Sequence, residues 1–393
     1  MREVDPKTSD VVIVGAGFAG AALAHVLVKT GLSLTLVDRY ESCRPCFKAE
    51  KVEPDQVEIL RELGLFHLIA PTLTRISSVA SAYRGRVIEI AHLEQYGADF
   101  HEMVNALRKN LPGEVRQEVA RVQSVDCSGS EPRVLLDDGR TLSTRLVVLA
   151  AGTSPSILAA AGLEREDIRK GHSLAFGFDL RPSSLGKEAC SIGSRFDSMT
   201  YYSERPRSLY DFLTLFPIGD RLRANLFTSL NPRSREARDL LSDPQVVVDR
   251  TLPKLRHLTG PLEQLGKTDA QRIDLYRVRP SPTGGVVAIG DAHQSVCPAT
   301  GTGLSKVLTD VQVAGESIPR WLSAGDTGVE TLDEYYSDPR KIKCDQDSIA
   351  GADYHYSFAT NQSFRWHIHR FVRYQLAAVR GHKSNFLRAN RSM

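Results

Sequence analysis

The sequence predicts an α/β protein in which a parallel-sheet domain is interrupted by an antiparallel α+β insert and followed by a helical C-terminal region. A short apolar strand, a glycine-rich turn and a helix occupy residues 11–29. Alternating apolar and polar residues with several aromatic side chains fill residues 172–232, as in an antiparallel sheet with one covered face. Another apolar strand and a glycine-broken loop follow at residues 285–303, so the parallel-sheet segments flank the insert.

Length and composition limit the classes of protein that the chain can represent. Its 393 residues, 41% hydrophobic and 25% charged, suffice for one large domain or two interleaved ones. No apolar run approaches the roughly 18 residues of a membrane-spanning helix, and the charged N-terminus is unlike a signal peptide. The formal net charge of +3 is too small to indicate nucleic-acid binding. We therefore expect a cytoplasmic protein with no nucleic-acid partner.

The glycine-rich turn has the residue order of a dinucleotide-binding unit. Gly15 permits a sharp exit from the strand, Gly17 lets the backbone approach a pyrophosphate, and Gly20 lets the helix pack closely on the sheet. The next strand ends at Asp38, where a carboxylate accepts hydrogen bonds from ribose hydroxyls. This segment predicts a Rossmann-like domain with a dinucleotide held by Gly15, Gly17, Phe18, Ala19, Gly20, Asp38 and Arg39.

The loop after the strand at 285–289 favours FAD over NAD. Asp291 directly follows this strand, so its carboxylate is placed to bond the ribityl chain of a flavin. The next helix would direct its N-terminus at the pyrimidine edge, where a reduced flavin carries negative charge. Two such loops at opposite ends of one chain suit a long cofactor with several parts. The predicted contacts of this second loop are Asp291, Pro298, Gly301, Thr302, Gly303 and Leu304.

On these residues the chain resembles the single-component FAD-dependent aromatic hydroxylases, the flavoprotein monooxygenases typified by para-hydroxybenzoate hydroxylase. The resemblance extends from Val11 to about Leu308 and includes both glycine loops. Asp38 stands where the family usually has a glutamate, and Lys48 replaces a cofactor-contacting arginine. The strand that ends at residues 150–154 lacks the aspartate of the family's Asp-Gly motif, which helps to seat FAD and NADPH.

The resemblance implies a monooxygenase that uses NADPH or NADH as a transient reductant of FAD. O2 would add to the reduced flavin as a C4a-hydroperoxide, and one oxygen atom would pass to a small, aromatic substrate. The sequence assigns no catalytic residue. Candidates for a group that accepts the substrate's proton, each with a core or surface role as the competing interpretation, are Tyr201, Tyr202, Tyr210, His172 and Arg223. His293 and Cys297 are interpreted as packing and loop-shaping residues.

Three alternatives to a monooxygenase stay open. One is a lipid or prenyl reductase on the same scaffold. A halogenase is less favoured, because Trp321 and Trp366 do not form the Trp-x-Trp motif of such enzymes. The third is a flavin-binding protein without catalysis. No metal site is predicted, since the Cys43–Cys46 pair has no second pair to complete it.

The predicted domains are discontinuous in sequence. The FAD-binding domain is expected to comprise residues 1–75, 100–170 and 280–325. The substrate domain is expected to comprise residues 76–99 and 171–279. The helical C-terminal region is expected at residues 326–393. From residue 361 onward the chain has seven Lys or Arg and no Asp or Glu, with apolar residues at helical spacing. This basic tail is expected to pack on the body of the protein, or to make a weak contact with a membrane surface or a partner.

Overall fold

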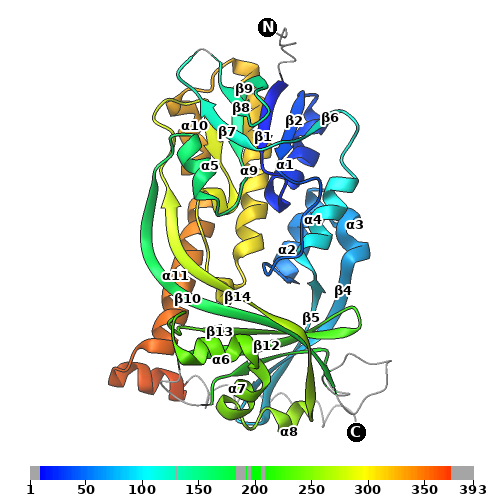
Figure 1. Ribbon diagram of the computed structural model, residues 1–393, viewed down its shortest axis with the longest axis vertical. Coiled ribbons are helices and arrows are strands. Elements are labelled where there is room, and N and C mark those ends of the chain that lie inside the picture. Colours follow the sequence, from blue (N-terminus) through cyan, green and yellow to red (C-terminus); the bar gives the residue numbers. More distant parts are fainter. Residues whose placement is uncertain (1–8, 130, 183–191, 193–195, 205–208, 373–393) are drawn as a thin grey trace.

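The computed structural model describes residues 9–129, 131–182, 192, 196–204 and 209–372. Two sheets lie at opposite ends of the molecule, and long helices run beside and between them (Figure 1). The predicted fold class is confirmed: a Rossmann-like sheet, a second sheet with mostly antiparallel pairing, and C-terminal helices. The candidate site lies between the second sheet and the loop that precedes the helix at Gly303–Ala324.

The first sheet is built around a parallel core. Strand β1 pairs in parallel with β2 on one side and with β9 on the other, and β9 also pairs in parallel with β15. Strands β7 and β8 add an antiparallel extension, in which β8 and β9 form a hairpin. The strands are β6 Val115–Val119, β2 Leu34–Asp38, β1 Ser9–Val14, β9 Thr141–Leu149, β15 Val286–Ala288, β8 Arg133–Leu136 and β7 Val122–Asp126.

Helices cover this sheet because its strands are apolar on both faces, as parallel strands usually are. Val11 and Ile13 pack with α1 and α9 on one face, and Val12 and Val14 pack with β7, β8 and α5 on the other. The helices of this half are α1 Phe18–Leu27, α2 Pro54–Glu62, α3 Phe66–Ile69, α4 Phe100–Lys109, α5 Pro155–Ala160 and α9 Gly303–Ala324.

The second sheet has eight strands, which are antiparallel except for the β11–β4 pair. Strands β10 and β14 are long enough to continue from this sheet to the side of the first one (Figure 1). In order the strands are β14 Leu262–Val278, β10 Arg165–Pro182, β13 Arg221–Thr228, β12 Tyr210–Ile218, β11 Ser198–Tyr202, β4 Leu73–Tyr83, β5 Arg86–Ala98 and β3 Lys51–Val52. Strands β4 and β10 begin a few residues before the predicted limits of the substrate domain.

The second sheet has two unlike faces. Alternate residues such as Phe176, Leu215 and Leu226 pack under the helices α6 Arg235–Ser242, α7 Pro244–Thr251 and α8 Arg256–Thr259. The opposite face carries Ala175, Phe212 and Phe227, which pack against Cys297 and Ala352 from the first domain and the C-terminal region. We call this second side the pocket face.

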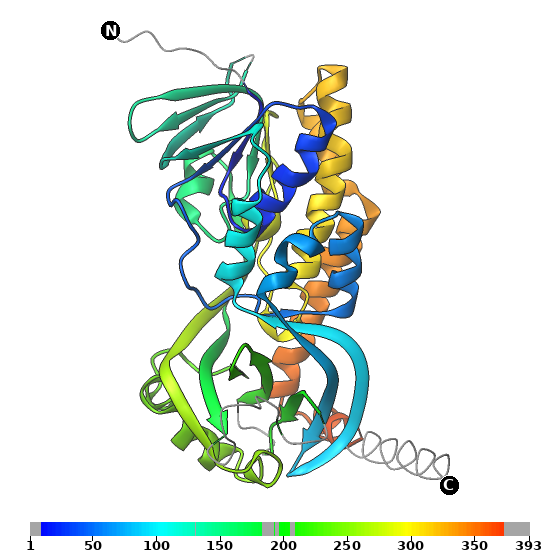
Figure 2. The same ribbon diagram turned by 90° about the vertical axis from the view of Figure 1, so that its right-hand side faces the viewer.

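The C-terminal helices connect both halves. Helix α10 spans Val329–Ser337, and α11 spans Pro339–Thr360, running beside α9 toward the second sheet (Figures 1 and 2). Residues 364–372 are also helical, and Phe364, Ile368, Phe371 and Val372 are exposed there. The rest of the predicted basic tail lies outside the described residues. Among the helices of the described ranges, none is both long and apolar enough to cross a bilayer.

Candidate functional site

The glycine turn lies at the carboxyl edge of the first sheet, where β1 has neighbours on both sides. In open α/β sheets this is the position of the ligand crevice. Gly15 has a φ of +105°, and a Cβ there would lie 2.7 Å from the carbonyl carbon of Ala150. A Cβ on Gly20 would lie 1.9 Å from the Gly15 carbonyl oxygen, whereas one on Gly17 would meet nothing within 4 Å. Packing therefore requires the first and third glycines, while the second borders open space.

Asp38 braces this turn. Its Oδ2 accepts a hydrogen bond from the Ala16 backbone N–H at 2.8 Å, and its Oδ1 accepts one from the Tyr40 N–H at 2.9 Å. A carboxylate oxygen can accept more than one hydrogen bond, so capacity remains for ribose hydroxyls. The Arg39 guanidinium lies 4.7 Å from the centre of the Tyr40 ring.

The second predicted loop, residues 290–303, connects β15 to α9, and we call it the Gly-Asp loop. It lies beside the glycine turn, since a Cβ added to Gly290 would be 3.4 Å from that of Ala19. Helix α9 begins at Gly303, and no side chain caps its N-terminus at Thr302. The Gln56 amide fixes the turn just before this helix, since its Nε2 donates a hydrogen bond to the Gly301 carbonyl at 3.0 Å. The N-terminus of α9 is thus free to face a ligand.

Lys48 and Asp291 lie between these two loops. The Lys48 ammonium is 3.8 Å from Asp291 Oδ2 and 5.7 Å from the centre of the Phe100 ring. It is also 3.5 Å from the position that a Cβ on Gly152 would occupy, so the end of β9 reaches the same place. The structure thereby places the predicted residues of both cofactor loops along one edge of the first sheet. Open space at Gly17, the uncapped α9 and this lysine fit a long anionic cofactor such as FAD.

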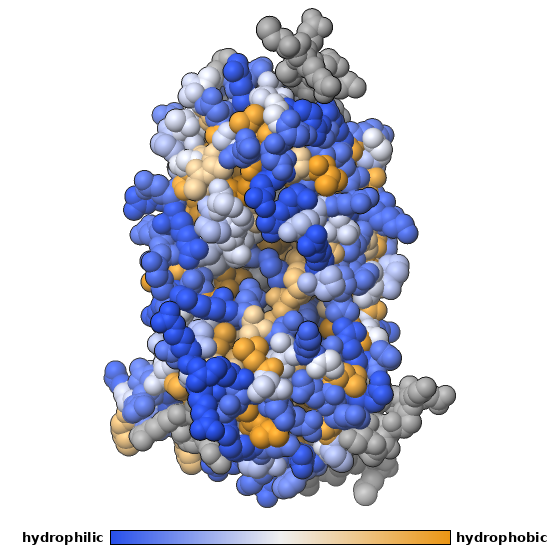
Figure 3. Space-filling view, in the orientation of Figure 1, coloured by the Kyte–Doolittle hydropathy of each residue, from blue (hydrophilic) through white to orange (hydrophobic). Residues whose placement is uncertain are grey.

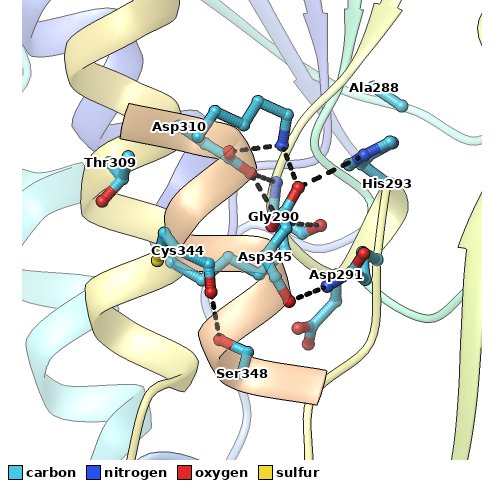
Figure 4. Close-up of polar contacts among 12 residues, drawn as sticks. Ala288, Gly290, Asp291, His293, Thr309, Asp310, Cys344, Asp345 and Ser348 are labelled. Atoms are coloured by element: carbon cyan, nitrogen blue, oxygen red, sulfur yellow. Dashed lines mark hydrogen bonds and ion pairs between the residues drawn. The ribbon is translucent and has the colours of Figure 1, made fainter. Parts of the chain in front are cut away.

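A cluster of buried ion pairs, which the sequence did not predict, supports the Gly-Asp loop. Its charged side chains come from α9 and α11. Asp310 Oδ2 accepts a hydrogen bond from the Gly290 N–H at 2.6 Å, and Lys306 Nζ is 2.9 Å from the same oxygen. From α11, Lys341 Nζ lies 2.8 Å from Asp310 Oδ1 and 3.1 Å from Asp345 Oδ2. Figure 4 shows Asp310 and Asp345 close to Gly290. All four charged side chains are buried, so their charges are compensated by one another.

The pKa shifts of Lys306, Asp310 and Asp345 favour their charged forms, whereas burial lowers the pKa of Lys341 despite the two carboxylates beside it. Burial alone would raise the pKa of Asp310, but the charges of Lys306 and Lys341 hold it below its usual value. The carboxylates likewise outweigh the burial of Lys306 and raise its pKa. His293, whose Nε2 is 3.6 Å from Asp345 Oδ2, has its pKa lowered by burial to about 4. His293 is therefore neutral near pH 7.

One sequence signal for this cluster is a pair of i,i+4 spacings, Lys306–Asp310 on α9 and Lys341–Asp345 on α11. Such pairs are common on exposed helix faces, where they contribute little. The apolar neighbours of Asp310 in the run VLTDVQV indicate burial instead.

Arg223 has a structural role at the boundary of the domains. Its guanidinium forms ion pairs with Glu50 at 2.9 Å, Asp179 at 3.2 Å and Asp269 at 3.0 Å. A Cβ on Gly177 would lie 2.5 Å from Arg223 Nη2, so the glycine leaves room for this side chain. Burial raises the pKa of Glu50 to about 7 despite the attraction of Arg223.

The tyrosine candidates divide between the two faces of the second sheet. Tyr201 and Tyr210 belong to the core under α6–α8 and donate hydrogen bonds to Glu204 at 2.6 Å and Glu236 at 2.8 Å. Burial raises the pKa of both phenols. Tyr202 packs on the pocket face beside Phe212, with a ring-centre separation of 6.3 Å.

A pocket lies between the pocket face, the Gly-Asp loop and α11. Its lining residues are His172, Ser173, Leu174, Asp211, Phe227, Thr228, Ser229, Cys297, Ala299, His355 and Tyr356. Two of them are named in the sequence analysis, His172 as a candidate proton acceptor and Cys297 as a packing residue. Asp211 and His355 were missed, because residues 144 positions apart meet only in the folded chain. Figure 3 shows the surface hollowed between the two halves of the molecule.

Neither His172 nor Cys297 is poised to react. The His172 ring nitrogens lie 3.1 Å from the Ala352 carbonyl oxygen and 3.1 Å from Ser173 Oγ, so both are occupied. Burial lowers the pKa of His172 and raises the pKa of the Cys297 thiol to about 11. Cys43 and Cys46 are free thiols. Within the described ranges, no group of three or more His, Cys, Asp or Glu could hold a metal ion.

Comparison with known proteins identifies the family. The family model described as "FAD binding domain" matches residues 8–344. A flavin-dependent monooxygenase of Legionella longbeachae is 28% identical over 166 residues, which is 38% of this chain and 41% of that protein. The match thus covers less than half of that relative. A digeranylgeranylglycerophospholipid reductase of Methanococcus vannielii is 22% identical over 363 residues, covering 85% of this chain and 83% of the relative.

Solved structures show the same fold. The p-nitrophenol 4-monooxygenase of Pseudomonas putida superposes with a TM-score of 0.75 at 16% identity, covering 98% of both chains. A flavin-dependent brominase superposes with a TM-score of 0.71 at 17% identity, covering 98% of this chain and all of that one. At such identities the likeness concerns the fold alone.

Substituting Gly17 tests the cofactor loop. We expect Gly17→Asp to fold normally, because the position is open and Asp is a favourable N-cap residue. The new carboxylate would stand where the pyrophosphate is expected, so bound FAD should fall at least tenfold, measured by flavin absorbance after gel filtration. Gly113→Asp is the matched control, since it also has open space around its Cβ position. Equal FAD content in both variants would contradict the assignment.

Removing one charge from the buried cluster should destabilise the protein. Asp310→Asn leaves two buried ammonium groups against one carboxylate, at a cost of about 3–5 kcal/mol. Asp347→Asn breaks the exposed Lys343–Asp347 pair of α11 and should change the stability little, because solvent screens exposed ion pairs. Thermal midpoints compare the two variants. Similar midpoints would show that the cluster does not hold the loop.

His293 makes stability depend on pH. Its pKa in the folded chain is about 4, below the roughly 6.5 of an unfolded histidine. The unfolded chain therefore binds the proton first, and about 3 kcal/mol of stability present above pH 6.5 is lost as the pH falls toward 4. We expect His293→Gln to show a smaller drop in thermal midpoint between pH 7 and pH 5 than the unmodified protein. An identical drop would argue against this titration.

Proposed function

Since this chain belongs to the FAD-binding domain family, we propose that this FAD-dependent oxidoreductase is a monooxygenase. It transfers one oxygen atom of O2 to a small aromatic substrate, and the other leaves as water. The observation that carries this proposal is the pocket shared by the Gly-Asp loop and the aromatic pocket face. FAD, when bound, supplies the electrons and the activation of O2.

The chain's own residues would hold the cofactor along the edge of the first sheet. The glycine turn and the start of α1 would receive the pyrophosphate, and Asp38 the ribose. Lys48, Asp291 and the N-terminus of α9 would face the remaining part. The contact residues we propose are Gly15, Gly17, Phe18, Ala19, Gly20, Asp38, Arg39, Lys48, Asp291, Pro298, Gly301, Thr302, Gly303 and Leu304.

The pocket face would orient the substrate and exclude water. Phe212 and Phe227 have ring centres 4.8 Å apart and belong to the same buried cluster as Cys297 of the Gly-Asp loop. An aromatic wall favours a flat, apolar ring through stacking and burial. Water must be kept from the reacting atoms, because otherwise reduced O2 is released as hydrogen peroxide.

The reductant would be NADPH or NADH bound transiently. The sequence contains a single Gly-x-Gly-x-x-Gly turn after a strand, and we assign that turn to FAD. A nicotinamide would then bind in a groove without its own Rossmann fold.

A lipid reductase is the second candidate. The match to the Methanococcus reductase covers most of both chains, and the described helix at 364–372 exposes four apolar side chains. A weak contact of that helix with a membrane surface or a partner would suit a lipid substrate. A cytoplasmic location stays a prediction.

Oxygen consumption distinguishes the two candidates. FAD-loaded protein is given NADPH or NADH with phenols, anilines or indoles, and O2 uptake and peroxide are recorded together. A monooxygenase should show aromatic-stimulated O2 uptake with little peroxide. A reductase should instead consume nicotinamide without O2 when a polyprenyl lipid is supplied. Gly17→Asp protein serves as the cofactor-poor control, and indifference to every aromatic compound would contradict the monooxygenase.

A further inference from the structure

We propose that His355, held in place by Asp211, accepts the hydroxyl proton of a phenolic substrate in the pocket. This inference rests on the proposed monooxygenase function and narrows its substrate class to single-ring phenols. Nothing in the family match or the similar proteins assigns a role to either residue.

The hydrogen bond fixes which nitrogen of His355 is free. Nδ1 lies 2.6 Å from Asp211 Oδ2, and Asp211 is buried with 5% exposure. An ionised carboxylate can only accept, so in the neutral imidazole Nδ1 carries the hydrogen and Nε2 presents its lone pair. In the described part of the chain, Nε2 makes no hydrogen bond. His355 is therefore an oriented acceptor, in the way that a carboxylate orients the base of a catalytic triad.

The pair stands beside the loop that we assign to the flavin. His355 comes from α11 and Asp211 from β12, and they line the same pocket as Cys297 and Ala299 of the Gly-Asp loop. The Phe212 ring centre is 5.6 Å from that of His355. A substrate ring stacked on this aromatic wall would therefore lie beside the His355 ring.

The size of the pocket favours a small substrate. The space between its lining residues is about 270 Å³ with the part open to solvent included. The enclosed part as it stands holds about one water molecule. A single ring would enter by displacing side chains at the mouth, whereas a fused system would require larger movement.

The neighbouring groups leave His355 as the proton acceptor of the pocket. Arg169 is 3.4 Å from Asp353, and its guanidinium lies over the Tyr356 ring at 4.5 Å. His172 has both nitrogens occupied, and the Cys297 thiol is protonated at neutral pH. The titratable and charged groups packed around His355 are Asp211 on β12, Arg169 and His172 on β10, Cys297 in the Gly-Asp loop, and Asp353, Tyr354 and Tyr356 on α11.

The proton transfer balances without another reactant. The phenol O–H bond breaks, its electron pair stays on oxygen, and an N–H bond forms at His355 Nε2. Asp211 stabilises the resulting imidazolium. The phenolate donates electron density to the ring carbons that receive the oxygen atom. The proton then leaves to solvent, which His355 reaches because its side chain is 22% exposed.

The test uses 4-nitrophenol, whose phenol and phenolate forms absorb at different wavelengths. The compound is titrated into FAD-loaded protein without reductant, and its ionisation while bound is followed against pH. We expect the bound form to ionise at lower pH than the free compound. His355→Gln should abolish this shift, and Asp211→Asn should reduce it. His257→Gln, on the exposed end of α8, is the matched control and should behave as the unmodified protein.

Turnover gives the second readout. With phenols, kcat should fall about 10²–10⁴-fold in His355→Gln, the range for loss of a general base. FAD content and thermal midpoint of the variants show that they are folded. Unchanged ionisation and turnover in His355→Gln would overturn the inference but leave the monooxygenase standing, as would failure of 4-nitrophenol to bind. Absence of O2 uptake with every aromatic compound would defeat the proposed function itself.

Discussion

The pairing of Lys306, Asp310, Lys341 and Asp345 beneath Gly290 is the interaction on which the rest of the site depends. Four charges in a dry interior are tolerable only when each faces an opposite one at close range. That requirement fixes α9 against α11, and the Gly290 N–H bond to Asp310 fixes the Gly-Asp loop on top of them. The loop in turn sets the start of α9 and the position of Asp291. One buried cluster therefore aligns the cofactor edge with the C-terminal helix that reaches the pocket.

The second sheet depends on the same alignment. Its helix-covered face is an ordinary apolar core, while its pocket face is closed by residues from the Gly-Asp loop and α11. Arg223 ties this sheet to the segment around Glu50 through a second buried ion pair. The pocket is consequently bounded by three parts of the chain that are far apart in sequence. Substitutions in β12, β13 or α11 can therefore change the substrate that the pocket accepts, while the cofactor loops stay the same.

The family match bears on the cofactor and the class of reaction, whereas the pocket bears on the substrate. The match over residues 8–344 accounts for FAD and for redox chemistry. Relatives with this fold are named as monooxygenases, reductases and halogenating enzymes, so the fold does not select among these reactions. The groups that face the substrate select among them. An oriented imidazole beside an aromatic wall suits a substrate with an ionisable hydroxyl group better than an isoprenoid chain.

The sequence by itself determined the fold class and the glycine turns, because local rules suffice for them. Gly15 and Gly20 must lack a side chain to let strand and helix pack, and that need is visible as spacing along the chain. The cofactor contacts proposed for the glycine turn follow from the same spacing. Only the tertiary structure decided which polar groups share the pocket. Tyr201 and Tyr210 turned to the helix-covered face, since side chains alternate along a strand. His355 met Asp211 only because α11 crosses the second sheet, and no local pattern encodes a contact between residues so distant in sequence.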